Sequence, residues 1–187
     1  MNIQHKSSLL LVLILAFAIS SGATAQTEPG TFTAKKGVYL EVGGSSGFYA
    51  INYSKIFHQK GKLKLNASAG FSIWPNRNID SKTSWLPALP LEISALYGKS
   101  NHHLELGMGF TSYLNTSFDF DSETFETIKK VVFDAFIPLR VGYRYQKPEG
   151  GFFFRFGYTP IVTFPVRAGK IWSFNPYWAG LSFGKSF

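Results

Sequence analysis

The residue types that usually perform catalysis or bind metals are sparse in this chain. Cysteine is absent, so neither a disulfide nor a thiolate metal site can form. Beyond residue 25, the histidines are His58, His102 and His103. Adjacent side chains of a strand point to opposite faces, so His102 and His103 do not make a ligand pair. We interpret all three as polar residues at or near turns, and we expect no metal, no cofactor and no enzymatic activity.

A run of acidic residues offers the other candidate for metal chemistry. Asp119, Asp121 and Glu123 alternate as calcium-binding carboxylates do, but the run lacks the central glycine and the twelfth-position glutamate of an EF-hand. We interpret it as part of a solvated loop over residues 115–130, with room for a short helical turn. No Ser–His–Asp set can be assembled either, because the long connections contain no histidine.

The charges with the most informative spacing share one face of alternating segments. The clearest segment, residues 63–73, sets leucine, alanine, phenylalanine and isoleucine against lysine, asparagine, serine and glycine at every second position. This period of two is the signature of a strand with unlike faces. Sorting all such segments in this way places these charges on the small, polar face: Glu41, Lys64, Glu92, Glu105, Arg140, Arg144 and Arg155.

Charges sorted onto one face predict a membrane barrel with a polar lumen. A charge facing lipid costs roughly 2–4 kcal/mol at the midplane, whereas a charge facing the lumen needs only a partner. We therefore predict a lumenal Glu–Arg network with a structural role; a proton or ion path is the less favoured alternative. Lys55 and Lys185 fall on the apolar face, but near strand ends, where they can reach the headgroups.

The connections indicate how the strands are arranged. Eight segments alternate, and the turns after the second, fourth and sixth are short, at residues 58–62, 98–101 and 146–150. The opposite connections are longer, except for the brief glycine-rich turn at residues 43–47. Short periplasmic turns and longer outer loops are typical of outer-membrane barrels. The predicted fold is all-β: an eight-stranded antiparallel up-and-down transmembrane β-barrel with a polar, side-chain-filled lumen.

The N-terminal segment predicts export. A basic start precedes an apolar run, Leu9 to Ile19, and then Ala23-Thr24-Ala25. This is the pattern of a secretory signal, and the run is shorter than the roughly 20 residues of a membrane-spanning helix. We predict a cleaved signal peptide over residues 1–25, a flexible leader over 26–36 and the barrel over 37–187, located in the outer membrane.

The composition limits which kinds of molecule this protein is expected to bind. The formal net charge is +8, but the basic residues are spread along the chain, which disfavours nucleic acid and suits anionic surfaces. Aromatic residues make up 17% of the chain. No segment after the leader reaches the roughly 18 consecutive apolar residues of a transmembrane helix. We expect contacts with outer-membrane lipid and lipopolysaccharide, no nucleic acid and a monomeric chain.

The last strand carries the most specific pattern. Leu181, Phe183 and Phe187 alternate with Gly180, Ser182 and Gly184, and the chain ends Gly-Leu-Ser-Phe-Gly-Lys-Ser-Phe. With this ending, residues 37–187 resemble the small eight-stranded outer-membrane β-barrel proteins of Gram-negative bacteria, a porin-like group. The resemblance implies that Leu181, Phe183 and Phe187 form the signal read by the barrel assembly machinery. Lys185 departs from the pattern, because an apolar or aromatic residue usually stands there.

These observations favour a non-enzymatic integral outer-membrane protein, structural or presenting its outer loops to a partner. The alternative is a narrow channel or small-ligand carrier through the barrel. A third possibility, a periplasmic lipocalin-like barrel, would require the apolar face to point into the lumen.

Overall fold

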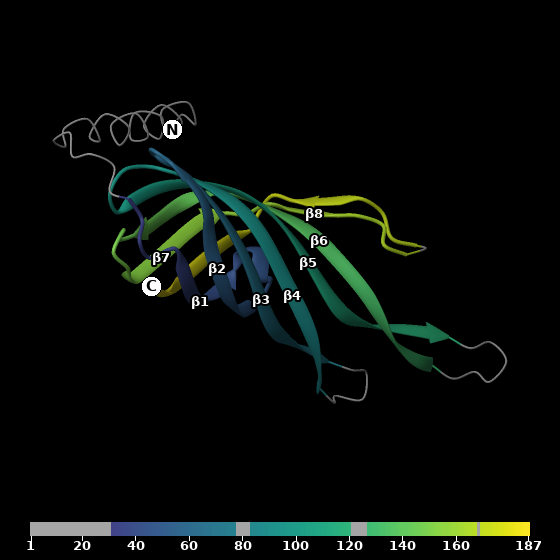
Figure 1. Cartoon of the computed structure of the whole chain (residues 1–187). Helices are drawn as coiled ribbons and strands as arrows, with labels where there is room; N and C mark the ends of the chain where they lie inside the picture. The colour runs from purple at the N-terminus through teal and green to yellow at the C-terminus, as the bar shows by residue number, and fades with distance from the viewer. Residues whose placement is uncertain (1–30, 78–82, 121–126, 168) are drawn as a thin grey trace, which may run out of the picture.

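The computed structural model describes residues 31–77, 83–120, 127–167 and 169–187 (Figure 1). The predicted signal peptide, residues 1–25, lies outside the described residues, as do Asp121 and Glu123. The described chain is almost entirely strand. Its elements are β1 (Lys36–Gly43), the 3₁₀ helix η1 (Gly44–Ser46), β2 (Tyr49–Lys60), β3 (Leu63–Arg77), β4 (Thr83–Tyr97), β5 (His102–Phe120), β6 (Thr127–Gln146), β7 (Gly151–Tyr158), β8 (Ile161–Thr163), β9 (Ser173–Asn175) and β10 (Ala179–Ser186).

The strands close into a barrel. Each strand from β1 to β6 pairs antiparallel with the next, and β10 lies between β7 and β1. In the closing pair, Leu40 lies opposite Phe183 and Glu41 opposite Ser182. The short β8 and β9 continue the lines of β7 and β10, and β8 also pairs with β6. The predicted eight-stranded antiparallel all-β barrel is confirmed.

The two ends of the barrel differ in length. At one end, here called the turn end, short turns join β2 to β3, β4 to β5 and β6 to β7. At the other, the hairpin end, the β3–β4, β5–β6 and β8–β9 arms project well beyond the barrel (Figure 1). The expected loop over residues 115–130 was wrong in its described part. There, Asn115 pairs with Val132 and Ser117 with Lys130, so β5 and β6 continue as a hairpin.

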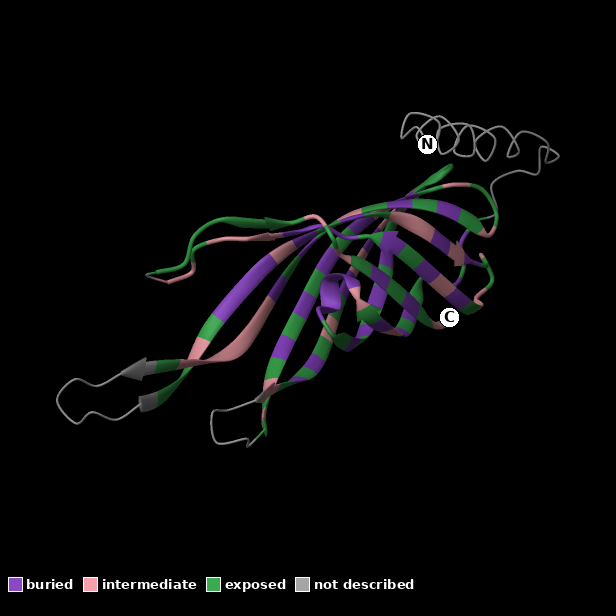
Figure 2. Ribbon diagram, turned by 180° about the vertical axis from the view of Figure 1, so that it is seen from behind, coloured by how far each residue is buried: buried purple, intermediate pink, exposed green. Residues whose placement is uncertain are grey.

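The barrel has an apolar outside and a polar inside. Along β4, Leu89, Leu91 and Ile93 are exposed, while Glu92 and Ser94 are buried, and Figure 2 shows the same banding on other strands. This is the reverse of a lipocalin-like barrel, whose apolar face would line the lumen. No helix among the described residues is long and apolar enough to cross a membrane.

The leader is packed where it is described. Phe32 is buried against Ile56 and Leu96 at the turn end of the lumen, and Ala34 is also buried. The backbone N–H groups of Thr33 and Ala34 both donate to the Pro148 carbonyl, over 3.0 Å each. Residues 31–35 therefore close the turn end instead of forming a flexible leader, and β1 begins at Lys36.

Candidate functional site

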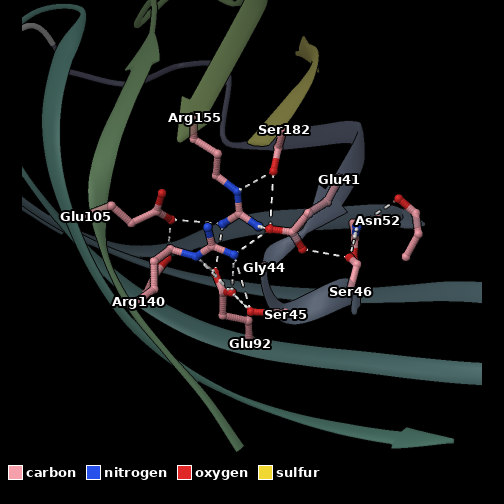
Figure 3. A network of polar contacts seen from close by, with 12 residues as sticks. Glu41, Gly44, Ser45, Ser46, Asn52, Glu92, Glu105, Arg140, Arg155 and Ser182 are labelled. Carbon is pink, nitrogen blue, oxygen red and sulfur yellow. Dashed lines mark hydrogen bonds and ion pairs between the residues drawn. The ribbon is translucent and has the colours of Figure 1, made fainter. Parts of the chain in front are cut away.

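The centre of the lumen holds one cluster of buried charges (Figure 3). Glu92 is its hub: its Oε2 lies 2.9 Å from Arg140 Nη2 and its Oε1 lies 2.7 Å from Arg155 Nη1. Arg155 also contacts Glu41, 3.1 Å away, and Glu105, 3.1 Å away. Arg140 forms a second ion pair with Glu41. Both guanidinium groups thus bridge carboxylates that come from different strands.

Small residues lie beside these long side chains. Arg140 lies opposite Gly107 on β5, and Arg155 lies opposite Ser182 on β10. A Cβ added at Gly107 would lie 3.5 Å from the side chain of Arg140, which is an ordinary contact, but one added at Gly44 would lie 3.0 Å from Arg140 Nη2. The close approach that requires glycine is therefore that of Gly44 to the guanidinium group.

The predicted charges do not all join the cluster equally. Arg144 lies at its edge, with Nη1 3.8 Å from Glu105 Oε1 and its guanidinium 4.7 Å from the centre of the Phe153 ring. Lys64 stands apart. Its Nζ donates to the Gly98 carbonyl over 3.2 Å and lies 4.8 Å from the centre of the Phe32 ring, at the turn end.

The cluster balances its charge. Three arginines, Arg140, Arg144 and Arg155, face three glutamates, and every one of these side chains is buried. Neutral hydrogen-bonding groups complete it, since Arg155 donates to Tyr39 Oη over 3.0 Å and to Ser182 Oγ over 3.0 Å. Among the six charged side chains, Arg140 Nη1, Arg144 Nε and Glu105 Oε2 make no hydrogen bond, so the cluster is balanced in charge but not fully hydrogen-bonded.

The 3₁₀ helix η1 covers the cluster from the hairpin end. Ser46 Oγ donates to Glu41 Oε2 over 2.7 Å, and Ser45 Oγ donates to Glu92. From the barrel wall, Trp178 Nε1 donates to the Gly44 carbonyl over 3.1 Å, and Thr111 Oγ1 donates to the Ser45 carbonyl. The first connection between strands is thus folded into the lumen, and its serines join the charge cluster.

Sequence reasoning missed this inward loop. The glycines and serines at residues 43–47 predicted only a turn. The three glycines all adopt positive φ, 69° at Gly43, 58° at Gly44 and 67° at Gly47, which lets the segment turn inward. The available signal was the shortness of this connection among long ones at the same end. A short loop of small residues can fit inside a barrel where a long loop cannot.

The residues of the expected assembly signal lie on the outer face. Leu181, Phe183 and Phe187 are exposed, as is Lys185 on the same face. The Phe187 N–H donates to the Lys36 carbonyl over 2.9 Å, which fastens the end of the chain to β1. Nothing in this geometry reports on assembly, so the signal stays a prediction.

The histidines divide between surface and lumen. His58 and His102 are exposed, and His102 Nδ1 lies 2.5 Å from Tyr143 Oη. His103, expected at an exposed turn, is buried and meets Phe32 edge-on with ring centres 5.2 Å apart, because strand parity turns it into the lumen. Among the described residues, no group of three or more side chains that could hold a metal is brought together.

Comparison with known proteins gives a likeness of overall fold alone. No family model matches the chain, and no curated protein matches it. Among solved structures, it is similar to the N-terminal β-barrel domain of Pseudomonas aeruginosa OprF, with 12% identity and a TM-score of 0.49, over 86% of this chain and 100% of that domain. A likeness at this level says nothing about what this chain does.

Proposed function

We propose that this protein is a non-enzymatic, integral outer-membrane β-barrel that presents its long hairpins at the cell surface. The observation that carries the proposal is the pairing of an apolar exterior with a fully buried charge cluster. Such a barrel suits a lipid environment, since its backbone is paired around the ring and its charges face the lumen, apart from those near strand ends such as Lys55 and Lys185.

The proposed orientation follows from the ends of the barrel. The short turns of the turn end are placed in the periplasm and the long arms of the hairpin end outside, as in other such barrels. The turn end carries the leader, so the predicted signal peptide precedes it on the side from which an exported chain arrives. Lys129 and Lys170 are exposed at the hairpin end, where lipopolysaccharide phosphates would meet them.

The filled lumen favours an anchor over a channel. A conducting path would have to cross the packed leader, the charge cluster and η1, in that order from the turn end. The projecting hairpins offer a surface for a partner instead, with exposed Phe118 on the β5–β6 arm and Trp172 and Phe174 around β9. Exposed aromatic side chains of this kind are enriched where proteins bind one another.

Two measurements test the proposal. Membrane fractionation should recover the protein with the outer membrane, released by detergent and not by carbonate, with heat-modifiable mobility on gels. In planar bilayers, the folded chain should give no conductance above background. Release into buffer without detergent would overturn the membrane location, and steady single-channel currents would overturn the anchor in favour of the narrow channel.

A further inference from the structure

The hairpin end of the lumen contains a cavity that the anchor role does not use. It has a volume of about 390 Å³ and lies between η1 and the start of the projecting arms. Five aromatic side chains line it: Phe48, Trp74, Tyr113, Phe136 and Trp178. We call it the aromatic cup. Its size falls within the roughly 300–1,000 Å³ of small-molecule sites.

The wall of the cup is rigid because it is packed from behind. Trp74 lies 4.9 Å from Tyr113 and 6.4 Å from Phe136 between ring centres, with the second pair stacked at 17°. Trp74 and Phe136 belong to a buried cluster with Ala88 and Ile161. The floor is also fixed, since a Cβ added at Gly47 would lie 2.5 Å from the Trp74 ring. Side chains held in this way cannot collapse to fill the cavity.

One polar group of the wall has no partner. Trp74 is only 8% exposed, and its Nε1 makes no hydrogen bond. The other indole of the cup differs, because Trp178 Nε1 donates to the Gly44 carbonyl. A buried N–H without an acceptor costs about 1–3 kcal/mol, and this one lies behind the ring face that lines the cup, out of reach of the cavity.

The rim is polar but already occupied by its own contacts. Asn76 Nδ2 donates to Asn115 Oδ1 over 2.6 Å, and Asn115 Nδ2 donates to Asp134 Oδ2 over 3.3 Å. Asp134 also pairs with Arg167 at 3.2 Å and with Lys170 at 3.5 Å. These pairs hold the mouth of the cup in place.

We propose that the aromatic cup binds a planar aromatic molecule of one or two rings. The flat walls suit offset stacking, for which ring centres lie roughly 4.5–7 Å apart. Because η1 and the charge cluster close the floor, the ligand enters and leaves at the hairpin end and does not cross the barrel. The site would let a surface anchor sense or hold a small aromatic compound.

The tryptophans of the chain provide a local readout. Trp74 and Trp178 line the cup, whereas Trp85 and Trp172 are exposed elsewhere, at 61% and 67%. The full chain, labelled with ¹⁵N at its indoles and folded in phosphocholine micelles, is titrated with quinoline, a flat bicyclic aromatic molecule. We expect the Trp74 and Trp178 signals to shift and saturate while the other two stay in place. Equal shifts at all four, or no saturation, would mean partition into detergent and would overturn the site.

Matched variants separate cup binding from folding. Leu86 lines the cup and Leu89, on the same strand, faces outward. Leu86→Trp should weaken quinoline binding at least tenfold, and Leu89→Trp should leave it unchanged. Trp74→Phe keeps a ring but reduces the flat area of the wall, and should weaken binding about three- to tenfold, read from the Trp178 signal. Wild-type affinity in both Leu86→Trp and Trp74→Phe would refute the proposal, and heat-modifiable mobility checks that each variant is folded.

Discussion

Replacing Glu92 with glutamine should destabilise the barrel strongly although the two side chains have almost the same shape. Glu92 holds Arg140 at 2.9 Å and Arg155 at 2.7 Å, and its two oxygens also receive the Arg140 Nε and the Ser45 hydroxyl. Glutamine keeps one acceptor but turns an NH₂ group toward guanidinium donors. It also leaves the cluster with one net positive charge, so we expect a loss of about 3–5 kcal/mol in the free energy of unfolding.

Glu105 provides an internal comparison. Its Oε1 faces Arg155 at 3.1 Å and accepts from Ser94, but its Oε2 has no hydrogen-bond partner. The NH₂ group of Glu105→Gln can take the Oε2 position without meeting a donor, so the loss should be smaller, about 1–3 kcal/mol. We therefore expect the free energy of unfolding to be lowest for Glu92→Gln, higher for Glu105→Gln and highest for the wild type.

The measurement is urea unfolding of the protein in phospholipid vesicles, followed by the heat-modifiable gel shift and tryptophan fluorescence. Glu149→Gln, at an exposed turn, is the matched control and should change the free energy of unfolding by less than about 0.5 kcal/mol. If Glu92→Gln unfolds within 1 kcal/mol of this control, the cluster does not stabilise the barrel and the reasoning is refuted.

Three further changes probe other parts of the molecule. Phe32→Ala removes a buried ring from the turn end and should cost about 3–5 kcal/mol by the same unfolding assay; an unchanged midpoint would show that the leader does not pack there in membranes. Ile93→Lys places a charge on the exterior and should cost about 2–4 kcal/mol in vesicles, whereas near-wild-type stability would argue that this face does not meet lipid. Phe187→Ala should slow assembly in cells, seen as unfolded protein in pulse-chase gels, while the purified variant refolds normally; equal assembly rates would remove Phe187 from the proposed signal.

Side-chain parity made most of the barrel predictable from the sequence. The barrel wall is a single sheet with an exposed outer face and a crowded lumen. Side chains must therefore alternate between apolar and polar along each strand. This is why Glu41, Glu92 and Glu105, far apart along the chain, could be assigned to one face. Which of the charges would pair could not be assigned, because pairing depends on height along the barrel. Lys64 also faces the lumen, but it lies at the turn end, away from the Glu–Arg cluster.

The sequence did not predict the elements in which side chains do not alternate between two faces. The described arms of β5 and β6 beyond the barrel have no buried face, so their sequence shows no alternation and resembled a loop. The leader closes the turn end and η1 is folded into the lumen, so neither is part of the wall, and their few buried residues, such as Phe32 and Ser45, carry no repeating pattern. Both are held by contacts to distant strands, which a single sequence does not reveal.

The charge cluster and η1 are not independent features. Ser45 and Ser46 donate to Glu92 and Glu41, the same carboxylates that neutralise Arg140 and Arg155. A loop of uncharged residues can enter the lumen only if it offers donors to groups that are already buried, and the carboxylates have lone pairs left over after pairing. The cluster therefore fixes the floor of the aromatic cup through η1. In this barrel, the residues that fill the centre also shape the cavity above it, although none of the cluster's charged side chains lines that cavity.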